Sequence, residues 1–145
     1  MDADVTETTG RYLSAVLLVS EREGRPAKTG EVAERLDVTP ASVTERLETL
    51  DERGLVDREK YVGATLTDDG EAVTRELMWK HCLAENFLAA DLDVEGADAF
   101  GVGNALSDEA ALALRSLIDH PCSSTCRAPN AEYDACRGNV RDPSV

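Results

Sequence analysis

Three cysteines and a histidine lie close together near the end of the 145-residue chain. They are His120, Cys122, Cys126 and Cys136, in the pattern H-x-C-x3-C-x9-C. Thiolates are soft ligands that suit zinc, copper(I) and iron–sulfur clusters, and His120, or else His81 or Cys82, could supply the fourth donor of a tetrahedral site. The gaps differ from the common C-x2-C pair of zinc sites. The pattern therefore predicts a metal, cluster or thiol-redox site, and it leaves open three incidental thiols in a mobile tail.

A second candidate ligand set is the pair His81 and Glu85, which share one face of a predicted helix, with Cys82 beside them. An imidazole and a carboxylate can hold a divalent transition metal, but two ligands are too few for a tight site. The alternative is an ordinary pair on a helix surface, with Cys82 serving as a packing residue. No nucleophile motif, phosphate loop or cofactor fingerprint accompanies the pair, so we do not expect an enzyme.

A third group has the composition of a surface that reads double-stranded DNA. Side chains on the exposed side of a predicted helix could reach base edges and phosphates, and two cations in a following hairpin could reach phosphates. Among them Glu45 could accept a hydrogen bond from a cytosine amino group. The candidates are Thr39, Ala41, Ser42, Thr44, Glu45 and Arg46 on the helix, and Arg58 and Lys60 in the hairpin.

Residues 28–70 supply the elements that would position this surface. Thr29 is expected to cap a short helix, Asp37-Val38 to form a turn, and Thr39 to cap the next helix with Pro40 at its first position. A wing of two strands with Gly63 as its turn or bulge residue follows. The inward residues are expected to be Val32, Ala33 and Leu36, then Val43, Leu47 and Leu50. This order predicts a winged helix-turn-helix, preceded by a helix over 6–23 that ends at Gly24.

For the remainder of the chain the sequence predicts helices followed by a tail with few aliphatic residues. Thr67 should cap a long helix over about 71–92, a short loose helix should lie within 93–106, and Ser107 should cap a last helix that ends at Pro121. The expected apolar stripe of the long helix, suited to a dimer interface, is Val73, Leu77, Ala84, Phe87 and Leu88, and the expected buried residues of the last are Leu112, Leu114, Leu117 and Ile118. The predicted fold is mainly α with a small β wing. Its domains are a winged helix-turn-helix over 1–72, a helical dimerisation or effector domain over 73–120, and a cysteine-containing tail over 121–145.

The charge balance is strongly acidic, with 15 basic and 29 acidic residues and a formal net charge of −14. Such a surface suits a cytoplasm at very high salt, where the Debye length falls to about 3 Å at 1 M, so we infer a halophile. An acidic chain is an unusual DNA binder, but the counterion-release contribution that favours basic proteins is weak in molar salt. With neither an apolar run of about 18 residues nor a signal-peptide pattern, we expect a cytoplasmic protein without a membrane partner.

The ordered set of segments resembles the diphtheria toxin repressor family of metal-dependent transcription regulators, including its manganese-sensing branch. The resemblance covers residues 6 to about 120. It rests on TTGRYLSAVLLV, EVAERLDVTPASVTERLETLDERGLV, GATLTDDG, LMWKHCLAENFL and DAFGVGNALSDE. It implies a homodimer with an N-terminal winged helix and a helical dimerisation domain, in which a divalent metal such as Mn²⁺ or Fe²⁺ enables operator binding.

Most of the family's ligand positions carry unsuitable residues in this chain. They fall on Arg11, Ser14, Phe100, Gly103 and Asn104, and only His81 and Glu85 retain ligand chemistry. We therefore hypothesise that the main metal site is dismantled, that Arg11 mimics the cation, and that sensing has moved to the C-terminal cysteines. The resulting prediction is a DNA-binding regulator, expected to be a repressor of metal-homeostasis or redox-related genes. The alternative is a metal-independent winged-helix regulator or a protein-interaction module without a ligand.

Overall fold

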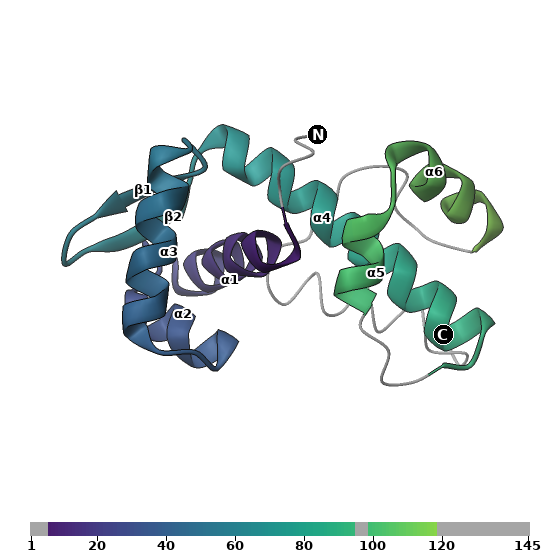
Figure 1. Ribbon diagram of the computed structural model, residues 1–145, viewed down its shortest axis with the longest axis horizontal. Helices are drawn as coiled ribbons and strands as arrows, with labels where there is room; N and C mark the ends of the chain where they lie inside the picture. Colours follow the sequence, from purple (N-terminus) through teal and green to yellow (C-terminus); the bar gives the residue numbers. More distant parts are fainter. Residues whose placement is uncertain (1–5, 95–98, 119–145) are drawn as a thin grey trace. The chain divides into compact units, whose positions relative to one another are not determined.

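The computed structural model describes residues 6–94 and 99–118, and its chain divides into two compact units, Met1–Thr74 and Arg75–Val145 (Figure 1). The elements in chain order are α1 Glu7–Glu23, α2 Thr29–Leu36, α3 Pro40–Glu52, β1 Val56–Glu59, β2 Gly63–Leu66, α4 Asp68–Asn86, the π-helical turn η1 Phe87–Asp91, α5 Ala99–Ala105 and α6 Asp108–Leu117. The predicted fold class, mainly α with a two-stranded wing, is confirmed. The roles assigned to residues 1–72, 73–120 and 121–145 stay a prediction.

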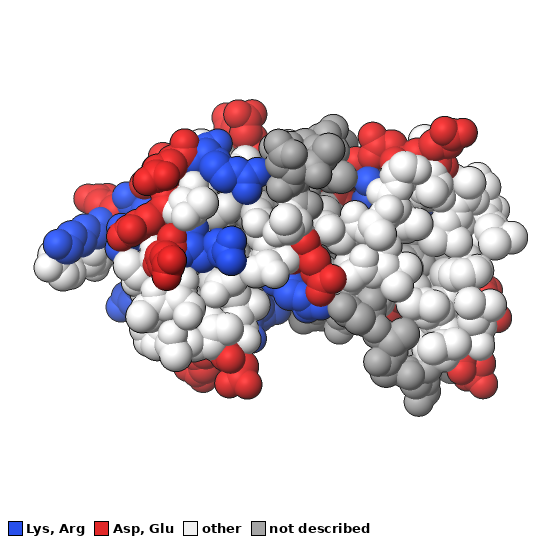
Figure 2. All heavy atoms as spheres, viewed as in Figure 1, with Lys and Arg blue, Asp and Glu red and all other residues white. Residues whose placement is uncertain are grey.

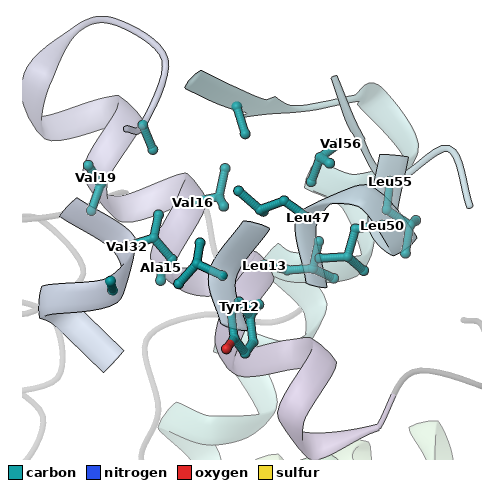
Figure 3. Close-up of a cluster of buried hydrophobic side chains, with 14 residues drawn as sticks. Tyr12, Leu13, Ala15, Val16, Val19, Val32, Leu47, Leu50, Leu55 and Val56 are labelled. Atoms are coloured by element: carbon teal, nitrogen blue, oxygen red, sulfur yellow. The ribbon is translucent and has the colours of Figure 1, made fainter. Parts of the chain in front are cut away.

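The first unit has one aliphatic core to which its helices and its hairpin contribute. Thr6 caps α1 by accepting a hydrogen bond from the backbone N–H of Thr9 at 3.1 Å, and Gly24, with φ +68°, ends the helix as predicted. The buried core residues include Leu13, Val16 and Val19 of α1, Val32 of α2, Val43, Leu47 and Leu50 of α3, and Val56 of β1 (Figure 3). This core holds α3 against α2 and β1 and leaves the other side of α3 exposed.

The helix-turn-helix follows the prediction apart from its first cap. Lys28, not Thr29, precedes α2, because Glu31 accepts the backbone N–H of Lys28 at 2.9 Å and so draws Thr29 into the first helical turn. Asp37, with φ +57°, ends α2. Thr39 caps α3 as expected: its hydroxyl oxygen accepts the backbone N–H of Ser42 at 3.2 Å, and Pro40 occupies the first position.

The wing is an antiparallel hairpin in which Val56 pairs with Leu66 and Glu59 with Gly63. Ala27, ahead of α2, bridges to Ala64 through two backbone hydrogen bonds of 2.9 Å. A Cβ atom on Gly63 would lie 2.5 Å from the carbonyl oxygen of Ala27, so this close approach requires glycine. The second strand of the hairpin is thereby joined, near its start, to the segment that leads into the helix-turn-helix.

The long helix differs from its predicted bounds and from its predicted stripe. Thr67 caps it, accepting the backbone N–H of Gly70 at 3.0 Å, so α4 starts directly after the cap at Asp68 instead of at Glu71. It ends at Asn86, where η1 replaces the last predicted helical turn. Met78, Trp79 and Leu83 are buried together with Leu77 and Ala84. The idea of a single apolar stripe was therefore wrong, since this part of α4 is buried on several sides.

The last helix buries a different face from the predicted one. Ser107 caps α6, as expected, by accepting the backbone N–H of Ala110 at 3.1 Å. Ala111 and Ile118 are buried, but Leu112 is 53% exposed and Leu117 72% exposed. Within the helix Ala111 is the buried residue, Ile118 follows the helix with an extended backbone, and Leu112 and Leu117 lie on other sides of the helix. The predicted burial of both leucines was wrong. The helix also ends at Leu117, before the predicted stop at Pro121, because the backbone of Ile118 is already extended.

Candidate nucleic-acid interface and metal ligands

The N-terminal half of α3 carries the predicted base-reading side chains on the outside of the first unit. Ala41 and Glu45 are exposed, whereas Thr44 is half-buried. The hydroxyl group of Thr39 caps the helix and also donates a hydrogen bond to the hydroxyl oxygen of Ser42 at 2.9 Å. Each of these two exposed side chains therefore holds the other in position. The geometry offers one acidic acceptor, Glu45, and a row of small polar groups to a DNA groove.

Arg46 is the predicted cation of this helix, and its guanidinium group is held over an aromatic ring. Its Cζ atom lies 5.7 Å from the centroid of the Tyr12 ring, a cation–π geometry. Tyr12 belongs to the buried core, so the ring is a fixed platform for the cation. The side chain of Arg46 is half-buried, which limits the positions that its charge can reach.

Arg58 and Lys60 of the wing line a hollow of about 220 Å³ together with Lys28, which precedes α2. The Nη1 atom of Arg58 also lies 3.8 Å from Glu48 of α3. Figure 2 shows that Lys and Arg side chains over the first unit alternate with acidic ones. Lys28 was not among the predicted DNA-binding residues. The available sequence signal was the scarcity of lysine, since two of the three lysines, Lys28 and Lys60, line this hollow.

Next to that hollow, an ion pair braces the start of α2. Arg25 donates two hydrogen bonds to the carboxylate of Glu31, at 2.8 and 2.7 Å. These bonds, together with the backbone N–H of Lys28, lower the pKa of Glu31 from 4.5 to about 2. The pair orients the first turn of α2, on which Lys28 depends for its position.

Two candidate metal ligands in the second unit are paired with each other. The Nε2 atom of His81 lies 3.3 Å from Glu85 on the same helix, and the ring of Phe100 in α5 lies 5.4 Å from the imidazole at a tilt of 58°. Cys82 is buried, and its sulfur atom accepts a weak contact from the side-chain amide of Asn86 at 3.5 Å. Within residues 6–94 and 99–118, no group of three His, Cys, Asp or Glu side chains could hold a metal ion.

The positions on which the resemblance places metal ligands are filled by packing groups. A Cβ atom on Gly103 would lie 2.7 Å from the carbonyl oxygen of Lys80 and 2.8 Å from the backbone nitrogen of His81, so α5 crosses α4 backbone to backbone. Phe100 is buried against His81. Arg11 donates to Glu7 one turn earlier in α1. The described residues at these positions therefore do not fit a manganese or iron centre.

Two polar atoms at the same set of positions lack a hydrogen-bond partner in the described part of the chain. They are the hydroxyl oxygen of Ser14 and the side-chain carbonyl oxygen of Asn104. Each is a single neutral oxygen in its own unit, which is a weak donor set for a transition metal. His120, Cys122, Cys126 and Cys136 lie outside the described residues.

Lys80 is a fully buried charge of the second unit, and the sequence patterns did not single it out. Its Nζ atom donates to the carbonyl oxygen of Leu106 at 2.8 Å and to Asp108 at 3.0 Å, and it lies 3.8 Å from Glu76. Burial raises the pKa of Glu76, whereas hydrogen bonds from Glu76 and Lys80 lower the pKa of Asp108. This network ties α4 to the junction of α5 and α6.

None of the helices in the described part of the chain is both long and apolar enough to span a membrane.

The family described as iron dependent repressor, N-terminal DNA binding domain, matches residues 4–64, which lie within the first unit. An uncharacterised HTH-type transcriptional regulator of Methanocaldococcus jannaschii is 33% identical over 102 residues, covering 68% of this chain and 82% of the relative.

Two further relatives are transcriptional regulators, and the second is metal-dependent by name. The HTH-type transcriptional regulator MntR of Lysinibacillus sphaericus is 44% identical over 77 residues, 53% of this chain and 55% of that protein. The crystal structure of the metal-dependent transcriptional regulator MtsR superposes with a TM-score of 0.67 at 25% identity, over 78% of this chain and 53% of the other. The chain thus spans about half the length of these two regulators.

These relatives are transcriptional regulators, so the predictions of a regulator and against an enzyme are confirmed, and the protein-interaction alternative is not favoured. Together with the winged helix of the first unit, the matches show that the chain belongs to the diphtheria toxin repressor family of metal-dependent transcription regulators.

Proposed function

We propose that the protein is a cytoplasmic homodimeric repressor that reads a palindromic operator with α3 and contacts phosphates through its wing. The observation that carries the proposal is the exposed N-terminal half of α3, with Glu45 and the Thr39–Ser42 pair on its surface, beside the cationic hollow of Lys28, Arg58 and Lys60. A dimer would present two such helices to two half-sites about one turn of DNA apart.

The test is a gel-shift series in molar KCl with duplexes from the gene's own upstream region. Arg46→Ala should weaken binding to every duplex, because its cation meets the phosphate backbone. Thr44→Ala and Glu45→Ala should change the preference between duplexes by about 1–3 kcal/mol at the positions they read. Losses of equal size on all sequences from these two changes would contradict the base-reading assignment.

We further propose that the family's main metal site does not operate in this chain. The support is the backbone contact at Gly103 and the Phe100 ring beside His81, which occupy the space that ligand side chains would need. Of the expected ligands, His81 and Glu85 remain, and they could at most form a weak site together with a partner outside the described residues. The proposed genes are those of metal homeostasis or redox balance, in keeping with the metal-dependent regulator MtsR among its structural relatives.

The metal test uses the full chain with Cys122, Cys126 and Cys136 all changed to Ser, so that the tail cannot supply thiolates. Calorimetric titration with Mn²⁺ and, under anaerobic conditions, Fe²⁺ should show no tight stoichiometric binding. A tight 1:1 isotherm that is lost in His81→Ala would mean that the main site is intact.

Sensing is assigned in this proposal to Cys122, Cys126 and Cys136, with His120 as a possible fourth ligand of zinc or of an iron–sulfur cluster. Anaerobic purification followed by metal analysis and a visible spectrum tests it. We expect bound zinc, or the absorption of a cluster, in the natural chain and neither in the triple serine variant. A colourless, metal-free protein whose DNA affinity ignores oxidants would refute a sensory role for these cysteines.

A further inference from the structure

The tip of the wing carries a tyrosine in an unfavourable place. Tyr61 lies between β1 and β2 with a φ of +67°, and its side chain is 94% exposed. A left-handed backbone costs free energy in any residue with a Cβ atom, and glycine, asparagine or aspartate usually occupy such positions. A large aromatic ring that stays exposed to water also contributes little to the free energy of folding. A left-handed backbone and an exposed aromatic ring at the same residue indicate a role that the free protein does not show.

The groups around the Tyr61 ring are suited to bind a polyanion that also has an apolar interior. The Nζ atom of Lys60 lies 5.2 Å from the ring centroid, and Arg58 and Lys28 line the same hollow as Tyr61. Val62, next along the chain, is also exposed, and its backbone N–H donates to the carbonyl oxygen of Glu59 at 3.0 Å to close the turn. The hairpin thus ends in two exposed apolar groups, and three cations and the single carboxylate of Glu59 line the adjoining hollow.

We propose that Tyr61 is a DNA-contacting residue of the wing that enters the minor groove beside the site read by α3. This inference rests on the proposed function. The minor groove is narrow enough to hold a flat side chain in contact with sugars and base edges, and apolar side chains are common wedges there. Lys60 and Arg58 would then meet the phosphates on either side of the groove.

The chemistry of the ring explains why it matters in this protein. A contact between an aromatic side chain and bases or sugars releases no counterions, so its contribution to affinity does not fall as salt rises. Contacts from lysine to phosphate lose strength in molar salt. For a chain with a net charge of −14, an aromatic contact supplies affinity that its charges do not.

The experiment measures the affinity of the full chain for a fluorescent duplex that the wild-type protein selects from a random library, at KCl concentrations from about 0.3 to 2 M. Tyr61→Asn removes the ring and keeps a residue that tolerates the left-handed backbone. We expect it to weaken binding about 5- to 30-fold at every salt concentration, the effect of one aromatic contact, with an unchanged slope of log affinity against log salt.

Two matched variants separate the ring from the charge and from folding. Tyr61→Phe should bind like the wild type, and Lys60→Ala should reduce the salt slope by about 1, as expected for the loss of one phosphate contact. The melting temperature of Tyr61→Asn should not fall. A fall in melting temperature with equal affinity losses in Tyr61→Asn and Tyr61→Phe would assign Tyr61 a structural role and overturn the proposal.

The groove is tested by replacing guanine with inosine in the flanks of the duplex, which removes the amino group that guanine presents in the minor groove. Wild-type affinity should change and that of Tyr61→Asn should not; an equal change in both would overturn the minor-groove assignment. Wild-type affinity in Tyr61→Asn would overturn the inference and leave the proposed function standing. Failure of the wild type to select any duplex would overturn both.

Discussion

The two units of the chain bury different kinds of group. In the first unit the core is an aliphatic cluster that holds α3 in place, and its cations lie at the surface around the wing. In the second, Lys80 is completely buried and α5 crosses α4 through a glycine. The family match at residues 4–64 lies in the first unit. Phe100, Gly103 and Asn104, which stand at ligand positions of the family but are unsuited to bind a metal, lie in the second unit.

On the proposal that the family's metal site does not operate here, this difference teaches that helix packing depends less on single residues than metal binding does. A metal ligand is one donor atom on one side chain, so a single substitution removes it. Helix packing depends on many contacts, and Phe100 and Gly103 supply such contacts at positions where the resemblance would place ligands. In the first unit, a substitution in the core would also change the position of α3, because the same residues form the core and orient this helix.

The largest effect is expected in the first unit from Gly70→Ala. The added Cβ would overlap the carbonyl oxygen of Leu55, so either the start of α4 or the base of the wing must shift. We expect a loss of about 3 kcal/mol in the free energy of unfolding, measured by denaturant titration in molar KCl. Gly30→Ala is the control: nothing lies within 4 Å of its Cβ position, and it should be neutral or slightly stabilising. Equal stability of both variants would show that the contact at Leu55 relaxes freely.

Lys80→Ala should give the next largest effect, in the second unit. It leaves the carbonyl oxygen of Leu106 without its donor and removes the cation that Glu76 and Asp108 face. We expect a loss of about 2–3 kcal/mol, with faster amide exchange in α5 and α6 by mass spectrometry. Lys60→Ala, at an exposed site, should change stability by less than about 0.5 kcal/mol. Protection of α5 and α6 at the wild-type level would mean that apolar packing alone holds them.

Gly103→Ala should destabilise the second unit by about 2 kcal/mol, because the new methyl group meets the backbone of Lys80 and His81. Circular dichroism melting measures the loss, with Gly30→Ala again as the matched control. The result bears directly on the metal hypothesis, since a methyl group that does not fit leaves no space for a longer ligand side chain. An unchanged melting temperature would reopen Gly103 as a position from which a ligand could act.

The smallest effect is pH-dependent and belongs to the first unit. The pKa of Glu31 is lowered from 4.5 to about 2, so the folded state binds its proton less readily than the unfolded state. The stabilisation from Arg25 is therefore present above about pH 4.5 and is lost as the pH falls towards 2. Glu31→Gln should be less stable than the wild type at neutral pH, and the two should converge in acid. Glu34→Gln, on the exposed side of α2, is the control for the loss of one carboxylate, and its stability at neutral pH should lie within about 0.5 kcal/mol of that of the wild type.

Local signals in the sequence determined most of the first unit. Thr39 followed by Pro40, the spacing of Val43, Leu47 and Leu50, and the polar hairpin act within a few residues, so they predict the helix-turn-helix and wing without knowledge of the rest. The caps at Thr67 and Ser107 are equally local and were also predicted. The resemblance to the family depends on these same segments and on their order.

Only the tertiary structure decided the features that join distant residues. Lys80 and Asp108 lie 28 residues apart in the chain, and Lys28 and Lys60 meet at one hollow because the hairpin returns to α2. The exposure of Leu112 and Leu117 depends on which side of α6 finds a partner. Hydrophobic spacing predicts that a helix has a buried side, but the packing of the other elements determines which side it is.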